Sequence, residues 1–327
     1  MLIHPAFALF FTSLITSIII TVSANSWLIA WVGLEINLLS FIPLILSKKN
    51  KYTTESALKY FLVQTLASIL MISAVCLNQE GISLLIILVS LLLKAGAAPS
   101  HQWLPAMVEG LSWPLFALMM TLQKMNPIIL IFFLMKTNMM YKTMIIYVVM
   151  SALVGSVGGL THNSLRKILT YSSIAHLSWI MSTLICTSWV WFMYFITYTF
   201  VLVSLIFLLS FTQSSTLTHI TTMNKSYLFF VIAMSILSLG GLPPFTGFLP
   251  KFLTLQQLAF TSQAPILVPL LSGTFISLFF YIRVLLASLI LSNSSPSSLT
   301  KFSSISAVYL NINVGGLLLP SLAMLFL

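Results

Sequence analysis

The sequence predicts an all-α polytopic membrane protein, and its composition carries most of that prediction. The 327 residues are 59% hydrophobic and only 6% charged, with a mean hydropathy of +1.09. Soluble domains have about 25% charged residues, so this chain has too little polar surface to cover a soluble core. Its apolar runs approach the ~20 residues of a membrane-spanning helix and lack the alternation of a membrane β-barrel.

The apolar segments predict about eleven transmembrane helices within a single integral membrane domain, residues 1–327. Their expected limits are 5–22, 26–46, 54–77, 81–98, 113–135, 140–160, 166–186, 189–211, 227–258, 265–289 and 305–326. The ninth segment is too long for one straight helix that crosses a bilayer.

Two of these segments contain residues that interrupt a regular helix. The fourth continues into Gly96 and Pro99, and the ninth contains LSLGGLPPFTGFLPK, with Gly241 and Pro244 near its centre. Proline removes a backbone donor and clashes with the preceding turn, so we expect both helices to be broken. Irregular backbone at membrane depth persists only inside protein or beside a water-filled cavity.

The positions of the two breaks predict an internal repeat. The first five spans, 5–135, and the next five, 140–289, form two units that are each broken at the fourth helix. An odd number of spans per unit inverts the second unit relative to the first. Interrupted helices at matching places in inverted repeats indicate a transport site. The span at 305–326 then follows as one C-terminal helix.

The cations in the short loops predict the orientation of the chain. The net charge of +10 arises from 14 Lys and Arg against four acidic residues. Alternating the spans assigns the following cations to the N-terminal side: Lys48, Lys49, Lys51, Arg166, Lys167, Lys225 and Lys301. Only Lys136 and Lys142 fall on the other side, so the N-terminus should face the matrix or cytoplasm and the C-terminus the opposite side. This loop location argues against a nucleic-acid partner.

Cysteine usage argues against a metal centre in this chain, and the N-terminal segment argues against a cleavable targeting peptide. Cys76 and Cys186 lie far apart in apolar segments, and the sequence has no CxxC pair. An iron–sulfur cluster or a zinc site in this chain is therefore not expected. The N-terminal segment predicts a first membrane helix and not a cleavable targeting peptide. The scarcity of Asp, Arg and Glu fits a protein made inside mitochondria.

Four charged residues lie inside the apolar segments: Glu35, Lys94, Lys124 and Lys251. A charge at the bilayer centre costs about 2.5–3.5 kcal/mol even on the lenient insertion scale. Such residues usually mark an ion or proton pathway, and we expect that role for all four. Glu35 could instead form a structural ion pair, and Lys94 or Lys251 could extend to the membrane interface.

Each of the buried groups has chemistry that suits proton transfer. Burial disfavours a lysine ammonium and a nearby carboxylate favours it, so Lys94 could gain and lose a proton reversibly. Lys124 is the deepest candidate, and Asn126 and Pro127 should loosen the helix just after it. His101 and His176 are further possible relays, although a satisfied buried histidine is equally ordinary.

Several longer stretches resemble a known family. They read WVGLEINLLSFIPL, ESALKYFLVQTLAS, LLLKAGAAPSHQWLPAMVEG, LQKMNP, LRKILTYSSIAHLSWI and LSLGGLPPFTGFLPKF, and they lie between about residues 27 and 260. In this order they resemble NADH dehydrogenase (ubiquinone) subunit 2, the antiporter-like membrane subunit of mitochondrial complex I. The resemblance implies an antiporter-like fold that lacks the first helices of the bacterial relatives.

The resemblance also implies a function and the roles of the site residues. Glu35 and Lys94 would form an ion pair, Lys124 would be the central relay, and Lys251 would lie toward the exit to the intermembrane space. Protons would cross the mitochondrial inner membrane, driven by electron transfer in other subunits. NADH, FMN, iron–sulfur clusters and ubiquinone would bind elsewhere in the complex, and this chain would bind no cofactor.

The resemblance implies as partners the other membrane subunits of complex I, including neighbouring antiporter-like subunits, together with membrane lipid. Two alternatives stay open from the residues alone. The chain could be a stand-alone cation/proton antiporter of the same fold. It could also be a mainly structural membrane subunit whose lysines hold helices together.

Overall fold

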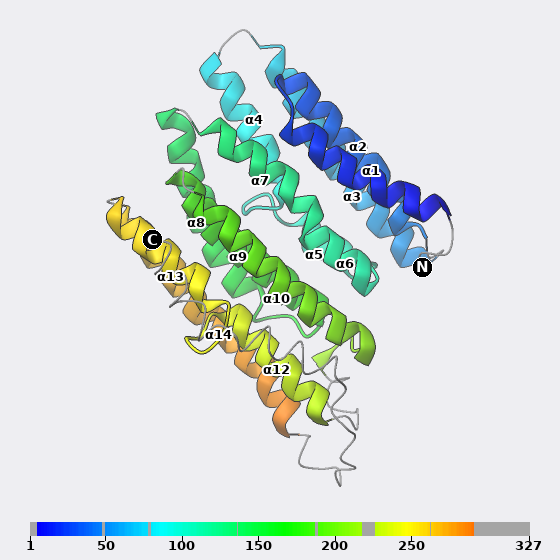
Figure 1. Ribbon diagram of the computed structural model, residues 1–327, viewed down its shortest axis with the longest axis vertical. Helices are drawn as coiled ribbons and strands as arrows, with labels where there is room; N and C mark the ends of the chain where they lie inside the picture. Colours follow the sequence, from blue (N-terminus) through cyan, green and yellow to red (C-terminus); the bar gives the residue numbers. More distant parts are fainter. Residues whose placement is uncertain are drawn as a thin grey trace. The chain divides into compact units, whose positions relative to one another are not determined.

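The computed structural model describes residues 5–47, 50–77, 80–135, 137–186, 189–217, 226–261 and 263–290. These residues form α-helices, one short 3-10 helix and connecting turns (Figure 1). The helices are α1 (Pro5–Val22), α2 (Trp27–Ile45), α3 (Lys51–Val75), α4 (Glu80–Ala95), α5 (Trp103–Val108), α6 (Trp113–Met120), α7 (Leu122–Leu134), α8 (Asn138–Gly158), α9 (Leu165–Ile185), α10 (Val190–Thr212), α12 (Ser226–Gly240), α13 (Phe248–Phe260), η1 (Ala264–Ile266) and α14 (Leu267–Ile290). The predicted all-α class is confirmed.

The helices have the length and composition of membrane spans. Within the described ranges, seven segments are long and apolar enough to cross a bilayer, and three shorter apolar helices accompany them. A helix satisfies its own backbone donors and acceptors, which hydrocarbon cannot do. The predicted C-terminal span at 305–326 lies outside the described residues, as do the loop cations Lys48, Lys49, Lys136, Lys225 and Lys301.

The chain divides into two compact units, Met1–Tyr147 and Val148–Leu327. The division falls inside α8 and not in the connection that precedes this helix. Each unit contains one of the two predicted helix breaks, between α4 and α5 in the first and between α12 and α13 in the second.

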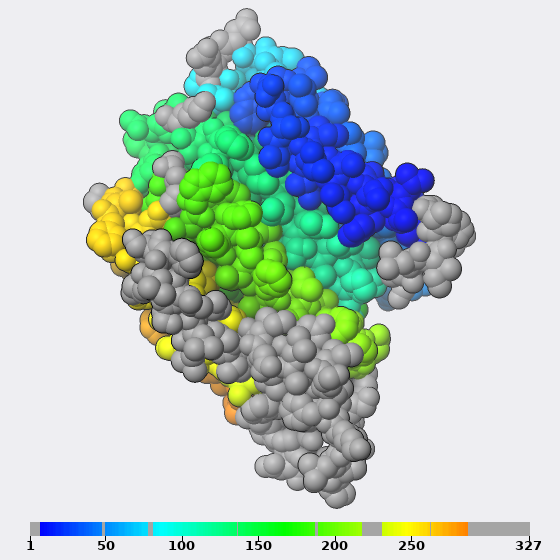
Figure 2. All heavy atoms as spheres, in the orientation of Figure 1, coloured from blue at the N-terminus to red at the C-terminus, as the bar shows by residue number. Residues whose placement is uncertain are grey.

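In the first unit, α1, α2 and α3 lie side by side, and α7 packs against both α1 and α4 (Figure 1). The Thr21 hydroxyl of α1 donates a hydrogen bond to Asn126 Oδ1 of α7 at 3.1 Å. The outer surface of α1, blue in Figure 2, is apolar and includes the exposed Leu9 and Ile19. This helix therefore presents hydrocarbon outward and a polar link inward, as a membrane helix in a bundle should.

In the second unit, α9 is the most enclosed helix and packs against α10, α13 and α14. Gly155 of α8 and Gly159, in the turn that follows α8, permit close approach of neighbouring helices. A Cβ at Gly155 would lie 2.6 Å from the backbone nitrogen of Ala175, and one at Gly159 would lie 2.8 Å from the Phe280 ring. Arg283 of α14 donates to the carbonyl oxygen of Leu160 at 2.9 Å and so fastens the turn that follows α8.

The first helix break is a Schellman motif at the end of α4. Gly96 has φ +76°, its N–H donates to Leu93 O at 3.1 Å, and Ala97 N–H donates to Leu92 O at 3.0 Å. This pair of bonds satisfies carbonyls that the end of the helix would otherwise leave open, and the left-handed conformation favours glycine. The predicted break is therefore confirmed, two residues after Lys94.

The second break also contains a glycine in the left-handed conformation. Gly241 has φ +74° and its N–H donates to Ser238 O at 3.0 Å, which ends α12. Gly247 then brings the start of α13 so close to the Ser238 carbonyl that any Cβ would overlap it. The chain can reverse into α13 there only because both turn positions lack a side chain.

A third break was not predicted. The segment expected as one helix over 113–135 is divided into α6 and α7 by Thr121, whose φ of −112° and ψ of −83° are not helical. The expectation that Asn126 and Pro127 loosen the helix after Lys124 is wrong, because α7 continues to Leu134. A proline ring clashes with the carbonyl four residues before it, so its distortion falls on the N-terminal side.

Replacing Gly155 with alanine should destabilise the second unit, because the added Cβ meets the backbone of α9 at 2.6 Å. Overpacking of this kind costs about 1–3 kcal/mol. Thermal denaturation of the detergent-solubilised protein measures the effect. Gly81→Ala is the control, since a Cβ there meets no atom within 4 Å. Equal melting temperatures for both variants would contradict the packing described here.

Candidate functional site

The three lysines predicted inside the membrane are all buried. The exposed fraction is 6% for Lys94, 3% for Lys124 and 8% for Lys251. The alternative that Lys94 or Lys251 extends to the interface is therefore not what the structure shows. Lys94 lies near the end of α4, Lys124 in the first turn of α7, and Lys251 in the first turns of α13. All three lie close to a helix break.

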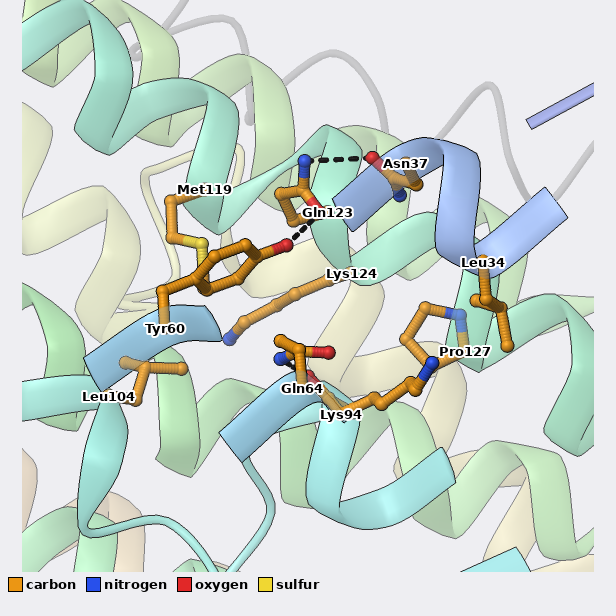
Figure 3. Close-up of a pocket in the computed structure, with 11 residues that line it drawn as sticks. Leu34, Asn37, Tyr60, Gln64, Lys94, Leu104, Met119, Gln123, Lys124 and Pro127 are labelled. Atoms are coloured by element: carbon orange, nitrogen blue, oxygen red, sulfur yellow. Dashed lines mark hydrogen bonds between the residues drawn. The ribbon is translucent and has the colours of Figure 1, made fainter. Parts of the chain in front are cut away.

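Lys94 and Lys124 line one cavity in the first unit (Figure 3). The other side chains around it come from α2, α3, α4, α5, α6 and α7: Leu34, Asn37, Tyr60, Gln64, Ala95, Leu104, Met119, Gln123 and Pro127. The space open to the centre of a water-sized sphere is about 20 Å³. About 10–15 Å³ on this measure accommodates one water that has polar partners, so the cavity suits a bridging water.

Figure 3 shows how the two lysines lie in this cavity. Lys124 extends into the space framed by Tyr60 and Gln64, whereas Lys94 extends toward Pro127. The Lys94 ammonium is buried and has no hydrogen-bond partner in the structure. The carbonyl of the same residue accepts a bond from Gln64 Nε2 at 3.4 Å, so the α3 side chain supports the end of α4.

Neutral side chains form a hydrogen-bonded chain along the cavity. The Tyr60 hydroxyl donates to Gln123 Oε1 at 2.9 Å, and Gln123 Nε2 donates to Asn37 Oδ1 at 2.9 Å (Figure 3). The three residues belong to α3, α7 and α2. None of them was among the predicted site residues. Amides within apolar segments were the available signal, but nothing in the sequence pairs them.

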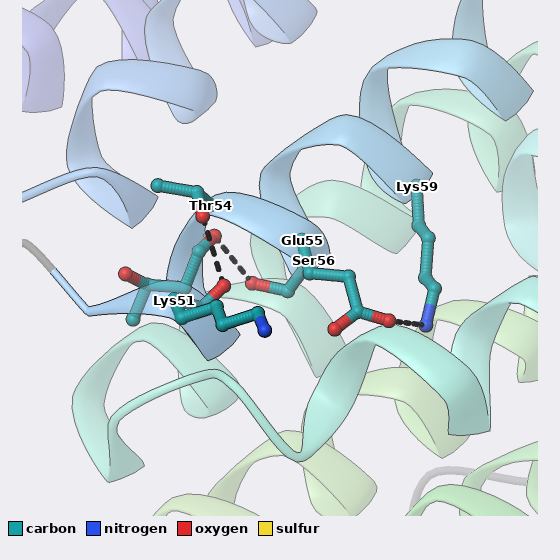
Figure 4. A network of polar contacts seen from close by, with 6 residues as sticks. Lys51, Thr54, Glu55, Ser56 and Lys59 are labelled. Carbon is teal, nitrogen blue, oxygen red and sulfur yellow. Dashed lines mark hydrogen bonds and ion pairs between the residues drawn. The ribbon is translucent and has the colours of Figure 1, made fainter.

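Glu35 is half-buried on α2 and acts electrostatically on both Lys94 and Tyr60. Its Oε1 atom is buried without a hydrogen-bond partner. The ion pair within 4.0 Å in the described part of the chain is Lys59–Glu55 at 2.6 Å, on the exposed start of α3 (Figure 4). In the described part of the chain, Glu35 and Lys94 therefore do not form the ion pair that the resemblance implied.

Lys251 is held by the second break. Its ammonium donates to the carbonyl oxygen of Gly240 at 2.7 Å, and this oxygen is at the C-terminus of α12. The carbonyl end of a helix carries partial negative charge and favours a cation. A Cβ at Gly241 would lie 2.7–3.0 Å from the Lys251 side chain, so glycine at this position also makes room for the lysine.

His176 is buried on α9. Its Nδ1 lies 2.9 Å from the Tyr194 hydroxyl, and its ring centroid lies 5.0 Å from that of Tyr198. A small cavity of about 10 Å³ on the same measure borders these residues together with Gly247 and Pro250 of the second break. The structure therefore brings His176 to the end of α12 and the start of α13.

His101 has a different location from the other candidates. It is half-exposed in the connection between α4 and α5, and its Nδ1 lies 3.2 Å from Pro99 O. It does not line the cavity of Lys94 and Lys124. No group of three His, Cys, Asp or Glu side chains that could hold a metal ion occurs within the described ranges.

This arrangement defines a class of protein before any comparison is made. Buried lysines beside helix breaks, with space for water, are features of membrane proteins that move ions or protons. The model of the family NADH:quinone oxidoreductase/Mrp antiporter, TM, matches residues 24–81 and 77–277. The chain belongs to this family.

Two relatives show which members of this family the chain is similar to. The chain is 40% identical to NADH-ubiquinone oxidoreductase chain 2 of Anopheles gambiae over 337 aligned positions, which cover 96% of each chain. It is 35% identical to the protein of the same name from Locusta migratoria, covering 89% of this chain and 88% of that one.

Solved structures share the fold at low sequence identity. A chain of respiratory complex I from Thermus thermophilus superposes with a TM-score of 0.82 at 24% identity, covering 98% of this chain and 78% of that chain. A chain of an archaeal membrane-bound sulfane sulfur reductase also gives 0.82, at 14% identity, with 94% and 70% covered. The antiporter-like fold is thus common to these membrane assemblies.

Replacing Gly241 with alanine should displace Lys251 from the Gly240 carbonyl. The left-handed conformation costs a non-glycine residue roughly 1–2 kcal/mol, and the Cβ would also crowd the lysine. A structure of the variant measures the distance from Lys251 Nζ to Gly240 O, now 2.7 Å. Gly240→Ala is the control, because its Cβ would meet side-chain atoms of Leu278 at 3.0 Å and of Tyr281 at 3.4 Å but not Lys251. An unchanged bond in Gly241→Ala would contradict this role.

Proposed function

We propose that this chain is a proton-translocating membrane subunit of respiratory NADH:ubiquinone oxidoreductase, complex I, in the mitochondrial inner membrane. The observation that carries the proposal is the cavity in which Lys94 and Lys124 meet, within a chain whose relatives are named as subunits of that enzyme. NADH, FMN, iron–sulfur clusters and ubiquinone would act in other subunits. The neighbouring membrane subunits and lipid would surround this chain.

The first unit would move a proton between two amines. A protonated Lys94 releases its proton to a water in the cavity, and that water gives a proton to a neutral Lys124. Glu35 acts on Lys94 through its field, so a change in charge near Glu35 alters the balance between the two lysines. Lys94 has no competing hydrogen bond to break during this step.

The second unit would receive the proton and release it on the other side. Lys251 is bound to Gly240 at the broken helix, and His176 borders the same break. In this proposal the units 5–135 and 140–289 are inverted repeats, so equivalent breaks serve opposite sides of the membrane. The N-terminus then faces the matrix and the C-terminus the intermembrane space. His101 lies outside the cavity of Lys94 and Lys124. Its half-exposed side chain is better placed to exchange protons at the end of the pathway than to relay them inside it.

The energies involved are compatible with this mechanism. Moving one elementary charge against 100 mV requires about 2.3 kcal/mol. One unit of change in pKa corresponds to about 1.36 kcal/mol, so modest shifts in proton affinity can drive the transfer. A field effect across a low-dielectric interior readily reaches this size.

Replacing Lys124 with methionine should abolish proton pumping or reduce it sharply, because methionine keeps the apolar stem and cannot carry a proton. Proton uptake by vesicles with the assembled complex, driven by NADH oxidation, measures the effect. Lys59→Met is the matched control, since Lys59 is a surface residue with a 41% exposed side chain. Normal pumping by an assembled Lys124→Met complex would refute the mechanism. Failure of Lys124→Met to assemble, with normal assembly of Lys59→Met, would favour a structural role for the buried lysine.

The stand-alone cation/proton antiporter differs from the proposal in its assembly. A subunit of complex I should be recovered in a large redox complex, and native mass spectrometry of solubilised membranes detects it there. The relatives and the Thermus structure favour this outcome. Recovery of the chain alone, with Na⁺ or K⁺ transport in liposomes, would support the antiporter instead.

A further inference from the structure

The hydrogen-bonded chain formed by Tyr60, Gln123 and Asn37 links three helices, α3, α7 and α2, through side chains alone. All three residues are buried, with exposed fractions of 2%, 9% and 5%. Both ends of the Gln123 amide are engaged, one by Tyr60 and one by Asn37. A buried polar network that is satisfied in this way fixes the geometry of its members.

The hydrogen-bonded chain acts at the start of α7, where the helix has no side-chain cap. Thr121 precedes the helix in the capping position, but it makes no side-chain bond to the first turn. Its hydroxyl donates back to Ala117 O at 2.7 Å. The first turn of α7, which carries Gln123 and Lys124, is therefore fixed from the side by the bonds of Gln123 and not by a cap.

Tyr60 is itself held rigidly. Its ring packs edge-on against Phe41 of α2 at a centroid distance of 5.2 Å and lies 6.2 Å from Trp103 of α5. Aromatic contacts of this geometry restrain the ring, so the hydroxyl presents a fixed point to Gln123. Asn37, Tyr60 and Gln123 all line the cavity that contains Lys124 (Figure 3).

We propose that Tyr60, Gln123 and Asn37 are positioning residues that hold the first turn of α7 so that Lys124 faces the cavity. The inference rests on the proposed proton-translocating function. Proton transfer through one water depends on alignment of donor and acceptor, and small displacements reduce the rate strongly. Without these hydrogen bonds, the first turn after the Thr121 break is less restrained, and the Lys124 amine is held less well in line.

Tyr60→Phe and Gln123→Met test the proposal in the assembled complex. Tyr60→Phe keeps the ring contacts and removes the bond to Gln123. Loss of one hydrogen bond, at about 1 kcal/mol, lowers the ratio of aligned to misaligned turns roughly five-fold, so the rate of NADH-driven pumping should fall by up to about five-fold. Tyr52→Phe is the control on the same helix, because Tyr52 is 74% exposed.

Gln123→Glu provides a conservative rescue. Its carboxylate still accepts from Tyr60, and the Asn37 amide can turn to donate to it. Pumping should be retained within about two-fold, since both bonds persist. The added negative charge joins Glu35 near the amines of Lys94 and Lys124 and favours their protonated forms, so the pumping profile should move to higher pH. The movement reports the added charge, and the retained pumping reports the restored bonds.

The outcomes separate this inference from the proposed function. Full pumping by Tyr60→Phe and Gln123→Met, with loss in Lys124→Met, would overturn the positioning role alone. Full pumping by Lys124→Met would overturn the function and the inference together.

The double variant Tyr60→Phe, Gln123→Met should pump no worse than the poorer single variant. Additive losses would show that the residues do not act as one chain, and they would overturn the proposal. Where Gln123→Met prevents assembly, Tyr60→Phe and Gln123→Glu decide the question.

Discussion

The cost of keeping a charged amine in a low-dielectric interior governs the design of this protein. Lys94, Lys124 and Lys251 are buried in helices whose remaining residues are mostly apolar. An ammonium in such a place requires water or oxygen atoms close by. Beside Lys251 a broken helix supplies such an oxygen, the Gly240 carbonyl, and beside Lys94 and Lys124 a cavity has space for water. The cavity and the turns are consequences of this single requirement.

The two units meet the requirement in different ways. In the first, Lys94 and Lys124 share a small cavity with the neutral side chains of α2 and α3, and Glu35 contributes through its field. In the second, Lys251 binds a carbonyl of the helix end directly. The first arrangement suits exchange of a proton between two groups. The second suits retention of a proton at one group until its surroundings change.

Sequence reasoning found the elements that depend on local composition. The helices and the burial of the three lysines follow from apolar runs, and two breaks follow from Gly96 and Gly241 with their neighbouring prolines. The break at Thr121 escaped detection because neither glycine nor proline occurs at or directly beside it. The links from Tyr60 and Asn37 to Gln123 span 63 and 86 residues of sequence. Neutral polar residues at such separations have no periodic signature, so only the folded structure reveals their contact.

The bond between Lys251 and the Gly240 carbonyl has a consequence for leakage. A carboxylate partner would be a second base, able to accept the proton and return it toward the side from which it came. A peptide carbonyl is far too weak a base to hold a proton at physiological pH. In the proposed pathway, the Gly240 carbonyl therefore stabilises protonated Lys251 without accepting its proton, so return of the proton at this point would need a water or another side chain. A backbone carbonyl can thus hold the ammonium of Lys251 in place without offering a second site for the proton.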